Sequence, residues 1–212
     1  MRRGPHKARY DRPSVDAVLD RGLVAHVAFV DGRDPCCIPM LYARVGDRVY
    51  IHGSRASRAL RTLAGGALAC VTVTIVDGLV LARSAFEHSA NYESVVVYGR
   101  FDAVEDEAAR LAAFEAFTEK LLPGRWSEVR RPSPKELRAT AILAMPIEEA
   151  SVKVRAGGPD DDDSPDAASE TWAGVIPLVT SFGAPEPSPG LRSGIPVAFS
   201  VARIVRARAA ST

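Results

Sequence analysis

Residues 49–60 read Val-Tyr-Ile-His-Gly-Ser-Arg-Ala-Ser-Arg-Ala-Leu: an apolar strand is followed by a basic turn that opens a helix. Backbone N–H groups at a helix start lack partners within the helix and, together with the helix dipole, attract an anion. Ser54 and Ser57 add hydroxyl groups to this turn. Arg55 and Arg58 add charged donors. The stretch is typical of a phosphate-binding turn, although an ordinary strand-to-helix turn with a serine cap and solvated arginines has the same pattern.

The composition fits one globular domain without a strong charge. The chain has 212 residues, 47% of them hydrophobic, and a formal net charge of +1, so nothing in its charge favours nucleic acid or a membrane surface as a partner. The longest apolar run, 68–76, contains two threonines and is too short to span a bilayer. Of the three cysteines, Cys36, Cys37 and Cys70, two are adjacent, so no disulfide framework is indicated and we expect a reducing, cytoplasmic setting.

Short β-rich runs joined by Asp-Gly and Gly-Asp turns predict an antiparallel sheet. The expected strands cover residues 23–30, 36–43, 48–52, 68–75, 79–84, 94–104, 140–145 and 150–155. The expected helices cover residues 15–21 with Ser14 as cap, 57–64, and 106–122 with a core-facing stripe of Leu111, Phe114, Phe117 and Leu121. This arrangement favours a mainly β, α+β fold: a small barrel of six or more strands with helices packed outside.

The composition changes toward both ends of the chain. Residues 1–13 are basic and are expected to form an extended arm, followed by the barrel domain in residues 14–156. Residues 157–170 contain consecutive aspartates and are expected to form a solvated, mobile linker. Residues 171–183 are apolar again and are expected to pack on the barrel or on a partner subunit. The tail, 184–212, is rich in proline, serine and alanine and is expected to be disordered.

Common catalytic and metal-binding motifs are absent from the sequence. It has no G-x-G-x-x-G, G-K-[ST] or G-x-S-x-G pattern, which argues against a Rossmann site, a P-loop and a nucleophile elbow. It also lacks H-x-x-x-H, H-E-x-x-H and Cys-x-x-Cys spacing, so no metal site is predicted. Polar residues at strand ends remain, namely His52 and Ser94, and each is either a ligand contact or an ordinary structural residue.

Taken in order, these segments resemble the pyridoxamine 5′-phosphate oxidase-like family of FMN-binding split barrels, and most closely its nitroimidazole-resistance and flavin-nucleotide-binding branch. The segments that carry the likeness are Ile38–Tyr42, Tyr50–Ser54 with Ser57-Arg58, Val71–Thr74, Asp77–Ser84, Asn91–Gly99, Lys153–Arg155 and Trp172–Pro177. The resemblance covers about residues 9–178. It implies a six-stranded antiparallel split β-barrel with flanking helices.

The resemblance also implies a flavin site, with FMN as cofactor and FAD, the deazaflavin F420 or heme as alternatives. The cofactor-binding residues that it implies are Pro39, Met40, Leu41, Tyr42, His52, Gly53, Ser54, Ser57, Arg58, Val73, Ser94, Lys153 and Trp172. Among them, Ser57 and Arg58 match the phosphate-binding pair, and the backbone of Pro39–Tyr42 matches the strand along the flavin ring. Ala59 stands where a lysine often follows the arginine, so Arg58 becomes more critical. His52 flanks the ring or the ribityl chain and is the candidate catalytic residue.

The function implied by the resemblance is an FMN-dependent oxidoreductase that reduces a small aromatic or nitro compound with electrons from NAD(P)H. A homodimer is implied, with the flavin between subunits and with Lys153 or Trp172 coming from the partner chain. The alternatives are a non-catalytic flavin- or heme-binding or storage protein and an F420-dependent reductase. Oxidation of pyridoxamine phosphate is not implied, because Tyr42 replaces the expected lysine and the C-terminal Arg-x-His signature is missing.

Overall fold

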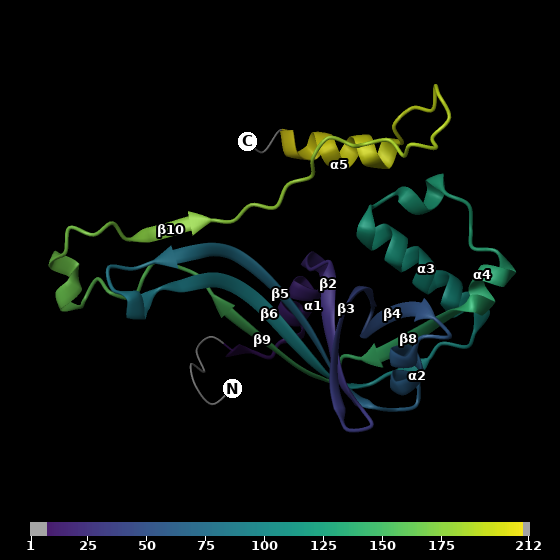
Figure 1. Cartoon of the computed structure of the whole chain (residues 1–212), viewed down its shortest axis with the longest axis horizontal. Helices are drawn as coiled ribbons and strands as arrows, with labels where there is room; N and C mark the ends of the chain where they lie inside the picture. The colour runs from purple at the N-terminus through teal and green to yellow at the C-terminus, as the bar shows by residue number, and fades with distance from the viewer. Residues whose placement is uncertain (1–7, 210–212) are drawn as a thin grey trace.

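The computed structural model describes residues 8–209, and these form one antiparallel sheet with helices on its faces (Figure 1). The strands are β1 (Ala8–Arg9), β2 (Val24–Asp31), β3 (Asp34–Val45), β4 (Arg48–Ser54), β5 (Leu68–Leu81), β6 (Ser89–Arg100), β7 (Asp102–Ala103), β8 (Thr140–Pro146), β9 (Glu149–Arg155) and β10 (Gly174–Pro177). The helices are α1 (Arg12–Arg21), α2 (Arg58–Ala64), α3 (Glu107–Leu121), α4 (Pro134–Ala139) and α5 (Phe199–Ala209), with short 3₁₀ turns η2 (Ala85–Glu87), η3 (Arg125–Glu128) and η4 (Pro165–Ala168).

The strand order is β1-β9-β6-β5-β2-β3-β4-β8-β7, and β10 pairs with β5. β3 joins the two halves, because its first part pairs with β2 and its last four residues, 42–45, pair with β4. Alternate side chains of β2, β4, β5 and β6 point inward and form the main core, for example Val27, Ile51, Val71 and Val97. The predicted α+β split-barrel class is confirmed. The number of strands differs from the expected six, since the described residues contain ten.

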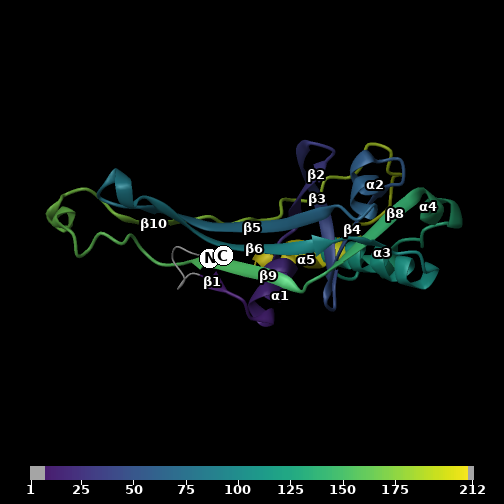
Figure 2. The same ribbon diagram turned by 90° about the horizontal axis from the view of Figure 1, so that it is seen from below.

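β5 and β6 extend well beyond the barrel, and the turn predicted at Asp77-Gly78 is wrong (Figure 2). β5 continues through this dipeptide with only a bulge between Val76 and Gly78, since β6 pairs with it on both sides of the bulge. For the same reason β6 begins at Ser89, earlier than the predicted start at Ser94. The long pairing overrides the local turn propensity of Asp-Gly.

Two helix predictions need correction. The N-cap of α1 is Asp11, whose side chain accepts a hydrogen bond of 2.9 Å from the backbone N–H of Ser14, so Ser14 lies inside the helix. In α3, Phe117 is buried, but Leu121 at the end of the predicted stripe is 50% exposed. The helix lies over Ala43 and the neighbouring strands through its middle turns, and its last turn projects past this contact.

The ends of the chain also differ from the expectations. Residues 1–7 of the predicted basic arm lie outside the described residues, while β1 pairs with β9 and α1 already begins at Arg12. In the segment expected to be a solvated linker, Asp161 is fully buried and accepts hydrogen bonds from the backbone N–H (2.6 Å) and the guanidinium (2.8 Å) of Arg83. The tail expected to be disordered contains the helix α5.

Tyr42 is a core residue in this fold. Its side chain is 1% exposed, and its hydroxyl lies 2.6 Å from the carbonyl oxygen of Leu19 and 3.1 Å from that of Gly22, at the end of α1. We therefore predict that Tyr42→Phe lowers the free energy of unfolding by about 1–3 kcal/mol. The Gly22 carbonyl loses its donor, while the Leu19 carbonyl keeps the hydrogen bond of 2.6 Å from the Lys120 ammonium. Urea unfolding measures this change. Tyr98→Phe, at a half-exposed position, is the control and should change stability little; an equal effect of both would contradict the prediction.

Among the described residues, no helix is both long enough and apolar enough to cross a membrane.

Candidate flavin site

Part of β3 has an open edge. Residues 34–41 of β3 pair with β2 on one side, and β4 joins the other side only from Tyr42 onward. In the described part of the chain no other strand pairs with this edge. Alternate residues of an unpaired edge direct their N–H and C=O groups outward, where they are available to a ligand. Pro39, Met40 and Leu41, three of the predicted ring-binding residues, lie on this open segment.

Arg58 is the exposed cation at the start of α2. Ser57, expected as the first residue of the helix, is instead its N-cap, and its side chain accepts a hydrogen bond from the backbone N–H of Leu60. The Nε atom of Arg58 lies 2.9 Å from a carboxylate oxygen of Asp31, at the end of β2, and the Arg58 side chain remains 72% exposed. The other Asp31 oxygen accepts a hydrogen bond of 3.1 Å from the hydroxyl of Thr62. Asp31 therefore orients the guanidinium while leaving it accessible to an anion.

The other polar residues of the turn are engaged within the protein. The hydroxyl of Ser54 accepts a hydrogen bond of 3.2 Å from the backbone N–H of Ala56, which stabilises the turn itself. Arg55 faces Glu105 at 3.8 Å instead of lying beside Arg58 and Asp31. Gly53 packs near Leu60 of α2. Of the two arginines, Arg58 is therefore the better placed to hold a phosphate group at this turn.

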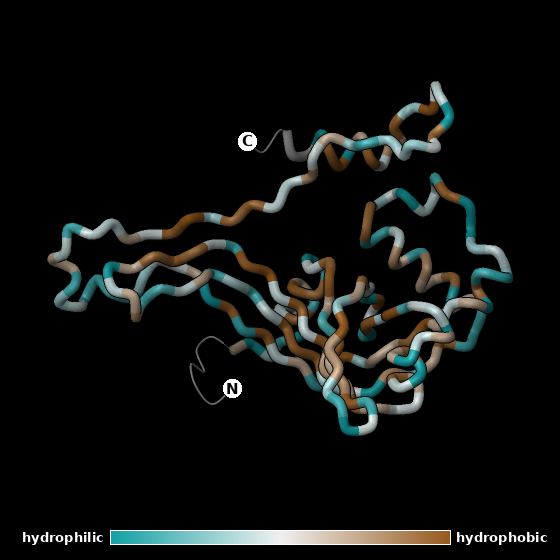
Figure 3. Tube along the Cα trace, in the orientation of Figure 1, coloured by the Kyte–Doolittle hydropathy of each residue, from teal (hydrophilic) through white to brown (hydrophobic). Residues whose placement is uncertain are grey.

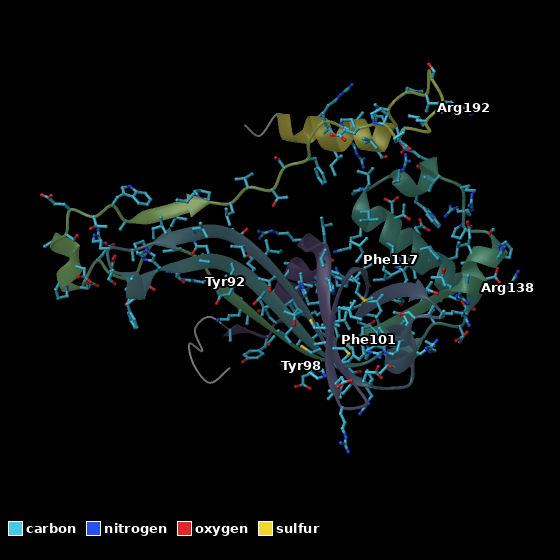
Figure 4. The ribbon with its side chains drawn as sticks, in the orientation of Figure 1. Tyr92, Tyr98, Phe101, Phe117, Arg138 and Arg192 are labelled. Carbon is cyan, nitrogen blue, oxygen red and sulfur yellow. The ribbon has the colours of Figure 1, made fainter. Side chains whose placement is uncertain are left out.

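His52 lies where β3 and β4 separate. It follows Ile51, the last β4 residue paired with β3, and its ring packs against α3, with centroid distances of 4.3 Å to Phe117 and 6.1 Å to Phe114. Phe117 is labelled in Figure 4, where it extends from α3 toward the sheet. The Nδ1 atom of His52 is buried and has no hydrogen-bond partner. Burial lowers the pKa of the ring below its ordinary value, so the neutral imidazole is favoured.

The lowered pKa of His52 gives a pH prediction. The unfolded chain takes up a proton at this histidine near pH 6.5, whereas the folded protein resists protonation, so the stabilising contribution is present above pH 6.5 and is lost as the pH falls. We expect His52→Phe, which cannot be protonated, to lose less stability than the wild type between pH 7.5 and pH 5.5. Urea unfolding at both pH values measures the difference. Parallel losses in the two proteins would contradict the assignment.

The side chains of Tyr42 and Val73 cannot contact a ligand at this site, because both lie in the core. The backbone of Val73 is different. β2 pairs with β5 along residues 69–72 and β10 pairs with it along residues 78–81, while the Asp77 carbonyl accepts a hydrogen bond from the backbone N–H of Leu178, which leaves a second open edge at residues 73–76. This edge and the open edge of β3 lie on opposite sides of β2. Only backbone groups of Val73 remain candidates for a cofactor contact.

Ser94, Lys153 and Trp172 lie apart from Arg58 in the single chain. Ser94 is the cross-strand partner of Lys153, and the Lys153 ammonium lies 5.1 Å from the centre of the Tyr92 ring, on the extended part of the sheet (Figure 4). Trp172 precedes β10 and is 64% exposed. β10 and α2 are at opposite ends of the molecule (Figure 1). One chain therefore does not gather all thirteen predicted residues at one place.

The sequence interpretation missed the residues that support this site. Asp31 belongs to the Asp-Gly pair between the expected strands 23–30 and 36–43, where the sequence indicates only a turn, although it holds Arg58. Phe114 and Phe117 were assigned to general core packing, and no local pattern connects them with His52. All three act through contacts between distant parts of the chain, which a local motif does not reveal.

Comparisons with known proteins show the family of the chain. The family model described as pyridoxamine 5′-phosphate oxidase matches residues 11–154. The flavocytochrome Anf3 from Azotobacter vinelandii is 39% identical, with 96% of this chain and 94% of that chain covered and a TM-score of 0.89. A FAD and heme binding protein from Mycobacterium smegmatis is 42% identical, with 93% and 97% covered and a TM-score of 0.89.

A more distant structure shares the fold. This protein, assigned to 5-nitroimidazole antibiotic resistance in Bacteroides thetaiotaomicron, is 18% identical, with 69% of this chain and 86% of that chain covered and a TM-score of 0.59. No curated protein matches the chain. The family model covers more than half of the sequence, and two relatives align over nearly all of it. The chain therefore belongs to the pyridoxamine 5′-phosphate oxidase family.

Proposed function

We propose that this protein is a homodimeric redox protein that binds a flavin, with FAD favoured over FMN, together with heme. The observation that carries the flavin assignment is the exposed Arg58 guanidinium, which Asp31 orients at the start of α2. Two relatives support the choice of cofactors: one is a flavocytochrome, the other binds FAD and heme, and both align over more than nine-tenths of this chain. Because of this similarity we propose heme as a cofactor in addition to the flavin, and not as an alternative to it.

Arg58 and Ser57 would hold the phosphate of the flavin. The guanidinium supplies charge-assisted donors, and the ion pair with Asp31 reduces the conformational entropy that the arginine loses on binding. The open edge of β3 would present peptide groups to the flavin ring, and those groups set its orientation and electronic surroundings. The bound flavin supplies the electron or hydride transfer.

His52 is the residue that fits an iron ligand. The neutral imidazole is the form that binds metal, and burial favours that form here. The buried Nδ1 without a hydrogen-bond partner leaves the ring without a polar contact that would explain its place against two phenylalanines. A planar apolar cofactor beside Phe114 would give these rings a further packing partner.

A second copy of the chain would complete the site. Lys153 and Trp172 lie far from Arg58 in one chain, so we propose that they reach the flavin bound by the other subunit. Electrons from NAD(P)H would then pass through the flavin to a small acceptor, an aromatic or nitro compound. The three cysteines are free thiols, namely Cys36, Cys37 and Cys70. This supports our proposal that the protein functions in a reducing, cytoplasmic compartment.

The absorption spectrum of the purified protein, loaded with FAD and hemin, tests this proposal. We expect the bands of oxidised flavin together with a Soret band, and loss of the flavin bands when NADH or NADPH is added without oxygen. Flavin bands alone would remove heme from the proposal, and a Soret band alone would remove the flavin. If the protein binds both cofactors but neither NADH nor NADPH reduces the flavin, the protein is a binding or storage protein, and the proposed enzymatic activity is contradicted.

A further inference from the structure

The C-terminal arm, residues 174–209, is fixed to the rest of the chain at two separated places. At its start, β10 pairs with residues 78–81 of β5. Near its end, the backbone N–H and the hydroxyl of Ser200 donate to Glu128 at 2.9 and 2.5 Å, and the Arg203 guanidinium donates to the carbonyl oxygen of Pro123. Figures 1 and 2 show the extended chain running from the far end of the sheet to α5, beside the end of α3.

Between these two anchors the arm exposes apolar side chains. Val179 is 84% exposed, and the hydropathy colouring in Figure 3 shows hydrophobic segments where the arm leaves β10. The other large apolar residues that the arm exposes are Ile176, Leu178, Phe182, Leu191, Ile195, Val197 and Phe199. A soluble monomer rarely presents so many apolar side chains along one extended segment, so this pattern indicates an interaction surface.

The outer face of the sheet exposes a second apolar set. Val24 and Leu41 are cross-strand partners on this face, and both are exposed. Val30, Leu68 and Val76 are exposed on the same face. α3 covers the outer face over β3, β4 and β8, near Ala43 and Ile142, and stops short of this region. The chain thus carries two separate apolar surfaces, one on the arm and one on the sheet.

The arm is shared with the two full-length relatives. Matches over 96% and 93% of this chain include most of the arm, whereas the family model ends at residue 154. The relative that matches 69% of the chain cannot include all of the arm and the barrel together. The two structures that include most of the arm superpose on this chain with a TM-score of 0.89. We infer that the arm has a defined position in the fold.

We propose that the arm of each chain closes over the outer face of the sheet of a second copy. In a two-fold dimer the same pair of surfaces meets twice, which covers both apolar sets at once. Residues 178–198 contain only Glu186 and Arg192 as charged residues, so the arm lacks the charge that a membrane surface or nucleic acid would select. The proposal rests on the homodimer of the proposed function.

Sedimentation of the full-length, flavin-loaded protein tests the arm. The variant Val179→Lys/Val197→Lys places two charges on its apolar surface, and Ser188→Lys/Ser193→Lys places two charges at exposed polar positions of the same segment. We expect the wild type and the serine variant to be dimers at low micromolar concentration. The valine variant should show at least a tenfold larger dimer dissociation constant, with an unchanged far-UV circular dichroism spectrum.

Limited chymotrypsin digestion of the wild type is independent of any substitution. If the arm lies on a second copy, cleavage between residues 178 and 199 slows as the protein concentration rises through the dimer dissociation constant. Two results would overturn the role of the arm without contradicting the dimer. One is a Val179→Lys/Val197→Lys variant that dimerises as tightly as the wild type, and the other is cleavage that does not depend on protein concentration. A wild type that remains monomeric at tens of micromolar would overturn both, while flavin titration would still report on the Arg58 site separately.

Discussion

Arg58→Ala is expected to weaken flavin binding by about ten- to a hundredfold, which is the loss that corresponds to one unmade charge-assisted hydrogen bond of about 1.5–3 kcal/mol. The arginine is exposed and oriented by Asp31, and no lysine follows it in the sequence, since residue 59 is alanine. Fluorescence titration of the apoprotein with FAD and with FMN measures the change. Because the side chain is exposed, the fold should tolerate the substitution.

Arg55→Ala is the matched control for this experiment. Arg55 lies in the same turn and carries the same charge, but it faces Glu105, so its loss should change flavin affinity less than threefold. Asp31→Asn keeps the size of the side chain, removes the charge that holds Arg58 and should give an intermediate loss. Equal affinities of wild type and Arg58→Ala for both flavins would show that the phosphate binds elsewhere.

His52→Ala is expected to abolish stable heme binding while the flavin bands persist. If His52 holds the heme iron as proposed, its loss would remove the bond to the iron, whereas the flavin contacts proposed for Arg58 and the β3 edge would remain. Hemin titration followed at the Soret band, and the flavin bands of the same sample, measure the two effects separately.

His26→Ala provides the comparison, because His26 is exposed on β2 and is the cross-strand partner of Pro39 on the open sheet face. This variant should retain heme. If His26→Ala loses heme and His52→Ala retains it, the iron ligand is on the sheet face and His52 is a structural residue. Thermal unfolding of both variants shows whether a lost Soret band reflects unfolding instead.

The local parts of the fold were predictable from the sequence. The run from Arg48 to Ala64 combines a strand, a hydroxyl cap and a short helix, and each piece follows from neighbouring residues; the structure has them as β4, Ser57 and α2. Asp77-Gly78 shows the opposite case, because its local turn propensity is real but weaker than the continuous ladder with β6. Propensity decides an element only where no long-range pairing competes.

The C-terminal part was hard to predict for a related reason. Asp161 lies among consecutive aspartates that look solvated, yet it is buried because Arg83, far away in the sequence, supplies both a backbone and a side-chain donor. α5 lies after a proline-rich segment, and Ser200 anchors it on Glu128. The candidate site has the same character, since Arg58 was visible in the motif but Asp31 was not.

The length of strand β5 sets the distance between the barrel and the start of the arm. Val73 packs in the core, and Leu81, near the far end of the same strand, pairs with Gly174, where the arm begins. At about 3.3 Å per residue these two positions are separated by roughly 25 Å. The arm therefore starts far from the barrel and returns to its own chain at Glu128. The residue count of one strand sets the span that the arm has to bridge between its two anchors.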